Sequence, residues 1–149
     1  MDKKVRIWGM LMRLTLSTKY AILALGELAR RGSFASVQEI ADTMEIPQAY
    51  LAKLVPLLVR MGILTSQRGR GGGVSLAKPA EMITLKEIIE AVEGPTSLQD
   101  CPFELSPCPG NPGCPLYPVW DPLRERIVEF LSQTSLAEVV QRIAPQKGG

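Results

Sequence analysis

Histidine is absent from this chain of 149 residues. Its absence excludes imidazole as a metal ligand, even one lent by a second copy of the chain. It also excludes the Ser–His and Cys–His pairs that many nucleophilic enzymes use. No pair of carboxylates stands out as a catalytic centre either. We therefore do not expect an enzyme.

Long apolar runs are also missing. The apolar run Leu54–Leu64 is interrupted by Arg60 and is too short to span a bilayer. The N-terminus lacks an apolar stretch followed by a small-residue cleavage site, which a secretory signal would require. These absences predict a cytoplasmic protein with no membrane partner.

Cysteine is scarce, and all three copies fall within fourteen residues, each followed by proline. They are Cys101, Cys108 and Cys114. An odd number cannot all form disulfides, and clustered cytoplasmic cysteines more often bind metal or sense redox state. Proline fixes the backbone while Gly110 and Gly113 allow tight reversals, so three thiolates here suit an iron–sulfur or zinc centre. The alternative is three free thiols in an irregular loop.

The net charge of +2 hides a division along the chain. Residues 1–80 carry 12 Lys and Arg against 5 Asp and Glu, a balance of +7, whereas residues 81–149 carry 5 against 10, a balance of −5. A basic first half indicates that this half meets a polyanion.

Two helices joined by a short turn are predicted in this basic half. Ser36–Glu39 has the pattern of a capping box and begins a helix that ends near Glu45. Pro47 suits the first position of a second helix, Gln48–Met61, in which Pro56 should cause a kink. The pattern fits a helix-turn-helix whose second helix enters the DNA major groove, or else an ordinary helical hairpin. The exposed candidates for DNA contact are Gln48, Ala49, Tyr50 and Lys53.

Two short strands, Ile63–Gln67 and Val74–Ala77, flank the glycine-rich loop Arg68–Gly73. A loop of this kind can bring its backbone close to phosphate or place an arginine in the minor groove. Phosphate-binding and dinucleotide motifs are not matched, because a strand follows and Val74 stands where a third glycine is needed. A solvated turn is the alternative. The wing candidates for DNA contact are Arg68, Arg70, Gly71 and Gly72.

Four further segments are predicted to be helical. One is capped by Ser17 or Thr18 and ends near Gly32, and another begins at the capping box Thr84–Glu87. A strongly apolar helix follows Pro118, and a short one runs from Ser135 to Ile143. A helix this apolar can pack on its own core or on a second copy of itself. We favour the second copy, because one winged helix reads one half-site, whereas regulators commonly pair two. The fold class is therefore mainly α with a small β-wing, a winged helix-turn-helix domain plus a long dimerisation helix.

These features together resemble a known family. The matching segments are Met12–Thr15, Tyr20-Ala21, Tyr50-Leu51, Gly62–Leu64, Arg68–Gly73, Leu85–Val92, the cysteine triplet, Trp120 and Leu136–Val139. The chain resembles the IscR/NsrR/RirA-type (Rrf2) family of bacterial iron–sulfur winged-helix transcription regulators. The combination of wing tip and cysteine triplet makes the resemblance specific.

The resemblance implies a homodimeric transcription factor that binds operator DNA and holds a [2Fe–2S] or [4Fe–4S] cluster. Cluster status, and through it iron, nitric oxide or redox stress, would then set DNA affinity. Cys101, Cys108 and Cys114 match the family's cluster ligands, and Arg68 matches its wing arginine. Where some members have a histidine or an acidic fourth ligand, this chain has Tyr117 and Lys19, so cluster type and fourth ligand stay undetermined.

The predicted division of the chain has five parts. They are an N-terminal extension (1–11), a winged-helix DNA-binding domain (12–94), a cysteine-rich cluster-binding loop (95–117), a dimerisation helix with a C-terminal helix (118–144) and a flexible tail (145–149). A zinc-stabilised regulator and a thiol switch are alternatives that use the same cysteines. A small iron–sulfur redox protein is less favoured, because an electron carrier needs no basic wing.

Overall fold

The computed structural model describes residues 15–95, 98 and 115–142. The helices are α2 (Leu16–Arg31), α3 (Val37–Met44), α4 (Gln48–Arg60), α5 (Leu85–Glu93), α6 (Tyr117–Gln133) and α7 (Leu136–Arg142), with a 3-10 turn η1 (Ala80–Met82). Strands β1 (Leu64–Gln67) and β2 (Gly73–Leu76) form a two-stranded antiparallel sheet. The predicted fold class is confirmed. Within the described ranges, no helix is both long and apolar enough to cross a membrane.

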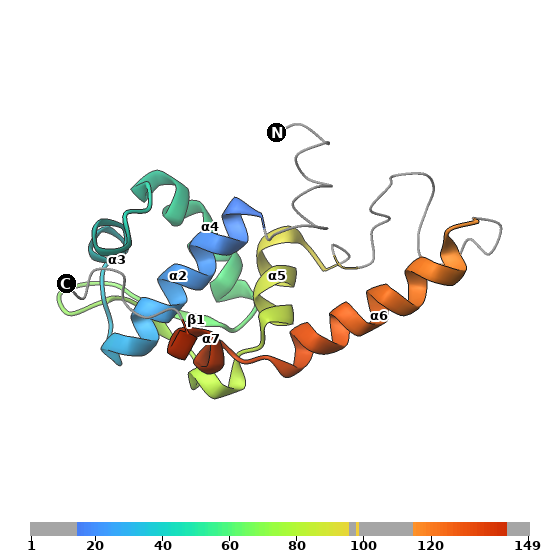
Figure 1. Cartoon of the computed structure of the whole chain (residues 1–149). Helices are drawn as coiled ribbons and strands as arrows, with labels where there is room; N and C mark the ends of the chain where they lie inside the picture. Colours follow the sequence, from blue (N-terminus) through green and yellow to red (C-terminus); the bar gives the residue numbers. More distant parts are fainter. Residues whose placement is uncertain (1–14, 96–97, 99–114, 143–149) are drawn as a thin grey trace.

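Helix α2 lies at the centre of the molecule, and α3, α4, α5 and α7 pack around it (Figure 1). Its apolar positions recur every three or four residues, so one broad face is buried. The fully buried side chains of the core are Leu25, Leu28, Ile40, Leu51, Leu58, Ile63, Ile83, Ile88 and Leu136. They come from every layer around α2, so these layers share one core.

Helix α2 begins two or three residues earlier than the predicted caps would place it. Thr15 has extended backbone, and its side chain accepts a hydrogen bond from the Thr18 N–H at 3.2 Å. The prediction of Ser17 or Thr18 as the cap is wrong, because both lie inside the first turn and Thr18 is buried. Gly32 takes the left-handed conformation at the C-cap, as predicted.

The turn between α3 and α4 is close to the predicted one. Ser36 caps α3 by accepting from the Glu39 N–H at 3.0 Å. Pro47 is the N-cap of α4 rather than its first helical residue, a difference of one position. Glu45 ends α3 in the left-handed region, with φ of 57°. Helix α4 continues through Pro56.

A buried carboxylate joins α2 to α3. Glu27 is buried and pairs with Arg30 and Arg31, each at 2.6 Å. Burial raises the pKa of the Glu27 carboxyl, but hydrogen bonds and charge from the two arginines outweigh burial and lower that pKa below its ordinary value. Arg31 also reaches Glu39 at 3.4 Å and Thr43 at 3.0 Å on α3. The network therefore fixes α3 against the end of α2.

The wing is a twisted hairpin that is joined to the chain before α3. Leu64 pairs with Leu76 at its base, and Gln67 pairs with Gly73 at its outer end. Val74 also exchanges two backbone hydrogen bonds with Ala35, at 3.0 and 2.8 Å. Gly73 has φ of +120°, and a Cβ there would collide with the Ala35 carbonyl. Glycine at this position thus lets the wing approach the helix-turn-helix closely.

Replacing Gly73 should destabilise the protein more than replacing a glycine at the wing tip. We expect Gly73→Ala to lower the free energy of unfolding by about 3 kcal/mol, since strain and a backbone collision combine. Gly71→Ala is the matched control, because Gly71 also has positive φ but has space around it. The control should cost about 1 kcal/mol. Urea unfolding of both variants measures the difference, and equal losses would contradict the close approach.

Candidate nucleic-acid interface

Helix α4 presents its N-terminal turn to solvent. Leu51, Leu54 and Leu58 are buried, which leaves the opposite side of the helix exposed. Gln48, Ala49 and Lys53 are exposed there, as predicted. The free N-terminus of a helix carries a partial positive charge that favours a nearby phosphate.

Tyr50 is an exception among the predicted residues, because it is only partly exposed. Its hydroxyl lies 2.6 Å from Ser17 Oγ on α2. Its ring packs edge-to-face on Tyr20, with centroids 5.1 Å apart and planes at 84°. The expected full exposure of Tyr50 is therefore wrong: the periodicity that buries Leu51 and Leu54 also draws Tyr50 toward α2.

The wing tip carries two exposed arginines, Arg68 and Arg70. Its backbone reverses through Gly69 and Gly71, both with positive φ, and the Gly72 N–H donates to the Gly69 carbonyl at 3.0 Å. A Cβ on Gly72 would collide with the Gln67 carbonyl. The glycines thus give a tight tip that holds both arginines outward.

The three cations of this surface have no carboxylate partner among the described residues, as is also true of Lys19, Arg60, Arg126 and Arg142 elsewhere. Lys53, Arg68 and Arg70 form no ion pair with any described residue. In contrast, the cations that pair with a nearby carboxylate are Arg30, Arg31, Lys78, Lys86 and Arg124. An unpaired, solvated cation is available to a polyanion without first breaking an ion pair.

The base of the wing is tied to α5. Lys78, just after β2, pairs with Glu87 at 2.6 Å, and Glu87 completes the capping box with Thr84. Burial raises the pKa of the Glu87 carboxyl, but bonds from Lys78 and Thr84 outweigh burial and lower it below its ordinary value. The carboxylate is therefore charged at neutral pH and holds the wing's exit against α5.

Helix α6 extends away from the rest of the molecule, with its N-terminal part farthest out (Figure 1). Its apolar stripe consists of Leu116, Val119, Leu123, Ile127 and Phe130, and each of these residues is at least 40% exposed. Spacings of three and four residues place them along one face of the helix. The neighbouring face packs on the core through Leu131 and Val128. An exposed apolar face of this size is typical of an interaction surface.

The three cysteines lie outside the described residues, as do the proposed extension at 1–11 and the tail at 145–149. Of the described residues on either side, Leu98 joins the core, and Tyr117 begins α6. Trp120, in the first turn of α6, has a buried indole N–H with no acceptor among the described residues. Tyr117 is partly exposed and Lys19 is exposed.

Sequence reasoning missed the hydrogen bonds that join α2 to two distant helices. Ser17 contacts Tyr50, which is 33 positions away, and the Thr15 hydroxyl donates to Glu93 Oε1, which is 78 positions away. No local sequence pattern predicts these two hydrogen-bonded pairs, because each residue taken alone has the pattern of a helix cap or of a solvated position.

Comparison with known proteins finds similarity to transcriptional regulators. A family profile described as an iron-dependent transcriptional regulator, Rrf2, matches residues 14–142. The chain is 33% identical over 131 residues to the HTH-type transcriptional regulator IscR of Klebsiella pneumoniae, covering 87% of this chain and 80% of that relative. It is 33% identical over 128 residues to an HTH-type transcriptional regulator of Aquifex aeolicus, covering 83% and 88%.

Solved structures give the same result for the fold. CymR, the global cysteine regulator of B. subtilis, is similar with a TM-score of 0.74 and 25% identity, covering 90% of this chain and 100% of CymR. T. potens IscR is similar in fold, with a TM-score of 0.69 and 22% identity over 95% of each chain. The named relatives are transcriptional regulators and not enzymes.

Proposed function

This chain belongs to the Rrf2 family of DNA-binding transcriptional regulators and is not an enzyme, and we propose that it works as a homodimer whose affinity for operator DNA is set by an iron–sulfur cluster. Three surfaces support the proposal: the α4–wing surface, the apolar stripe of α6 and the cysteine segment. The main observation behind DNA binding is the group of unpaired cations around α4 and the wing.

The α4–wing surface would bind DNA with its two parts in different places. The first turn of α4 would enter the major groove, with Gln48, Tyr50 and Lys53 nearest the bases and phosphates. The wing would lie on the backbone or the adjacent minor groove, through Arg68, Arg70 and the amides of Gly71 and Gly72. This division follows from exposure, because Gln48 and Lys53 on α4 and both arginines of the wing tip are exposed.

The apolar stripe of α6 would pair with the stripe of a second copy. One winged helix reads one half-site, and two copies would read two half-sites about one helical turn apart. Pairing also removes from water an apolar surface that nothing in the described chain covers.

The cysteine segment would hold the cluster through Cys101, Cys108 and Cys114. Three thiolates and no imidazole form a donor set suited to an iron–sulfur centre. The buried Trp120 N–H supports this fit, because sulfur of a thiolate or a cluster accepts such a bond. When bound, the cluster supplies a centre that oxidant, nitric oxide or iron shortage can alter. Reduced thiols and access to DNA place this activity in the cytoplasm.

Replacing the unpaired cations tests the DNA surface. The probe is a duplex that the wild-type protein selects from a random-sequence pool. Lys53→Ala and Arg70→Ala should each reduce the slope of log affinity against log salt by about 1, because each removes a phosphate contact. Arg68→Ala should weaken binding by roughly 1–3 kcal/mol and relax sequence preference. The control Arg126→Ala changes an exposed α6 cation; an equal effect there would rule out the assigned surface.

Charging the apolar stripe tests the dimer. Ile127→Lys should leave the fold intact but convert the dimer to monomer, because a lysine would be buried against the partner's stripe. Ser132→Lys is the matched control on the opposite side of α6 and should remain dimeric. Sedimentation equilibrium distinguishes the two. A dimeric Ile127→Lys variant would show that the stripe is not the interface.

Anaerobic purification with iron and sulfide analysis tests the cluster. We expect a brown protein absorbing at about 400 nm, the region typical of thiolate-bound iron. A variant with all three cysteines changed to serine should be colourless, and its DNA affinity should ignore iron supply. A colourless wild-type protein with bound zinc would make the segment structural, and a metal-free one would indicate a thiol switch. Either result would overturn the cluster proposal while leaving the DNA surface intact.

A further inference from the structure

The first turn of α2 holds the DNA-reading end of α4. The Ser17 and Tyr50 hydroxyls lie 2.6 Å apart, and the Tyr20 ring packs edge-to-face on Tyr50. Tyr50 belongs to the first turn of α4, the part proposed to enter the major groove. A small movement of the start of α2 would therefore move or release this turn of α4.

The same turn of α2 also holds the end of α5. Thr15, the N-cap of α2, donates its hydroxyl hydrogen to a carboxylate oxygen of Glu93, the last residue of α5. A carboxylate is unfavourable at the C-terminus of its own helix, but favourable at the positive N-terminus of another helix. The N-terminus of α2 thus attracts the Glu93 carboxylate, whereas the C-terminus of α5 repels it.

Glu93 is the last helical residue before the cysteine segment. Gly94 and Pro95 follow it, and Cys101 is eight positions further along. The two hydrogen-bonded pairs therefore form a continuous connection from the end of α5, through Thr15 and Ser17, to Tyr50 on α4. Only Leu16 separates Thr15 from Ser17, and both belong to one turn.

We propose that Glu93 and Ser17 are positioning residues, which couple the state of the cysteine segment to the placement of the first turn of α4. This inference rests on the proposed function, because it assumes that α4 reads DNA and that the cysteine segment changes state. Its physical content is that the two pairs act in series. Breaking either one should uncouple the segment from DNA affinity, without changing the residues that touch DNA.

The test compares DNA affinity in the cluster-loaded and cluster-free states, using the duplex selected by the wild-type protein. Wild type should show a ratio between the two states of roughly 5- to 150-fold, the usual range for coupled sites. Ser17→Ala and Glu93→Ala should each bring this ratio close to one, and the double variant should go no further. Ser17→Thr keeps the hydroxyl and should restore the wild-type ratio.

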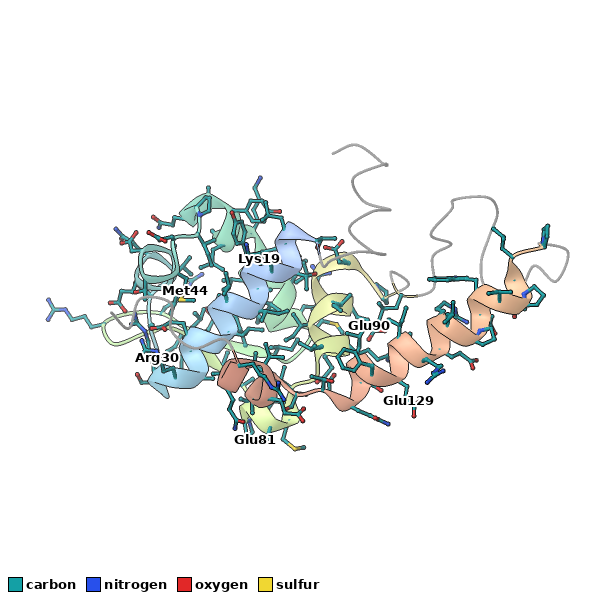
Figure 2. All side chains as sticks on the ribbon, in the orientation of Figure 1. Lys19, Arg30, Met44, Glu81, Glu90 and Glu129 are labelled. Carbon is teal, nitrogen blue, oxygen red and sulfur yellow. The ribbon has the colours of Figure 1, made fainter. Side chains whose placement is uncertain are left out.

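Two controls separate the connection from general damage. Glu90→Ala removes a carboxylate one turn earlier on α5 (Figure 2), whose one ion pair among the described residues is with Lys86 at 3.5 Å. Ser132→Ala removes a hydroxyl that donates to the Glu129 carbonyl in its own turn of α6. Both should keep the wild-type ratio, iron content and thermal midpoint. If Ser17→Ala and Glu93→Ala also keep the ratio, the inference is wrong.

A cluster-independent measurement distinguishes failure of this inference from failure of the proposed function. If wild type binds DNA equally in both states, cluster sensing has failed. The positioning roles of Ser17 and Glu93 are then tested by the DNA affinities of the cluster-free variants. There, effects of Ser17→Ala and Glu93→Ala on DNA affinity that do not add show that the residues act in series. Additive effects, or none, would overturn the inference.

Discussion

Burial of α2 against its neighbours is the interaction on which the rest of the structure depends. Leu25 and Leu28 are fully buried, and the helices that contact α2 include both halves of the helix-turn-helix, α5 and α7. Apolar burial has no direction of its own, so it brings these elements together without fixing their angles. Polar contacts at the two ends of α2 supply the direction. The Glu27 network fixes α3 at one end, and Thr15 and Ser17 fix α5 and α4 at the other.

Most helices were predictable because capping residues and glycines near their ends mark the boundaries. Thr84 and Glu87 form the predicted capping box, and Gly32 ends α2 in the expected left-handed conformation. The wing strands fall within one residue of prediction, since their glycine-rich loop permits few other structures. The errors are of a different kind. Thr15 replaces Ser17 or Thr18 as the cap because the apolar stripe of α2 buries Thr18.

The candidate site was predictable only in part, for a physical reason. Exposure of Arg68, Arg70 and Lys53 follows from periodicity and turn chemistry, which depend on near neighbours in the chain. The contact between Tyr50 and Ser17 cannot be predicted from near neighbours, because the two residues are distant in sequence and become adjacent only after α2 and α4 have packed. The pairing of Lys78 with Glu87 is likewise a tertiary property, whereas Arg30, Lys86 and Arg124 pair with carboxylates one turn away on their own helices. The cysteine ligands stay a prediction, since the structure describes none of them.

The close approach of the wing to Ala35 has a consequence for how operator preference could diversify. Gly73, where β2 meets Ala35, leaves no room for a side chain, whereas Gly69 and Gly71 at the tip have space around them. Backbone hydrogen bonds between Val74 and Ala35 thus hold this part of the wing against the segment before α3. Side chains at the tip can vary without changing these hydrogen bonds. Where the tip contacts DNA as proposed, exchanging tip residues would change operator preference while leaving the orientation of the wing unchanged.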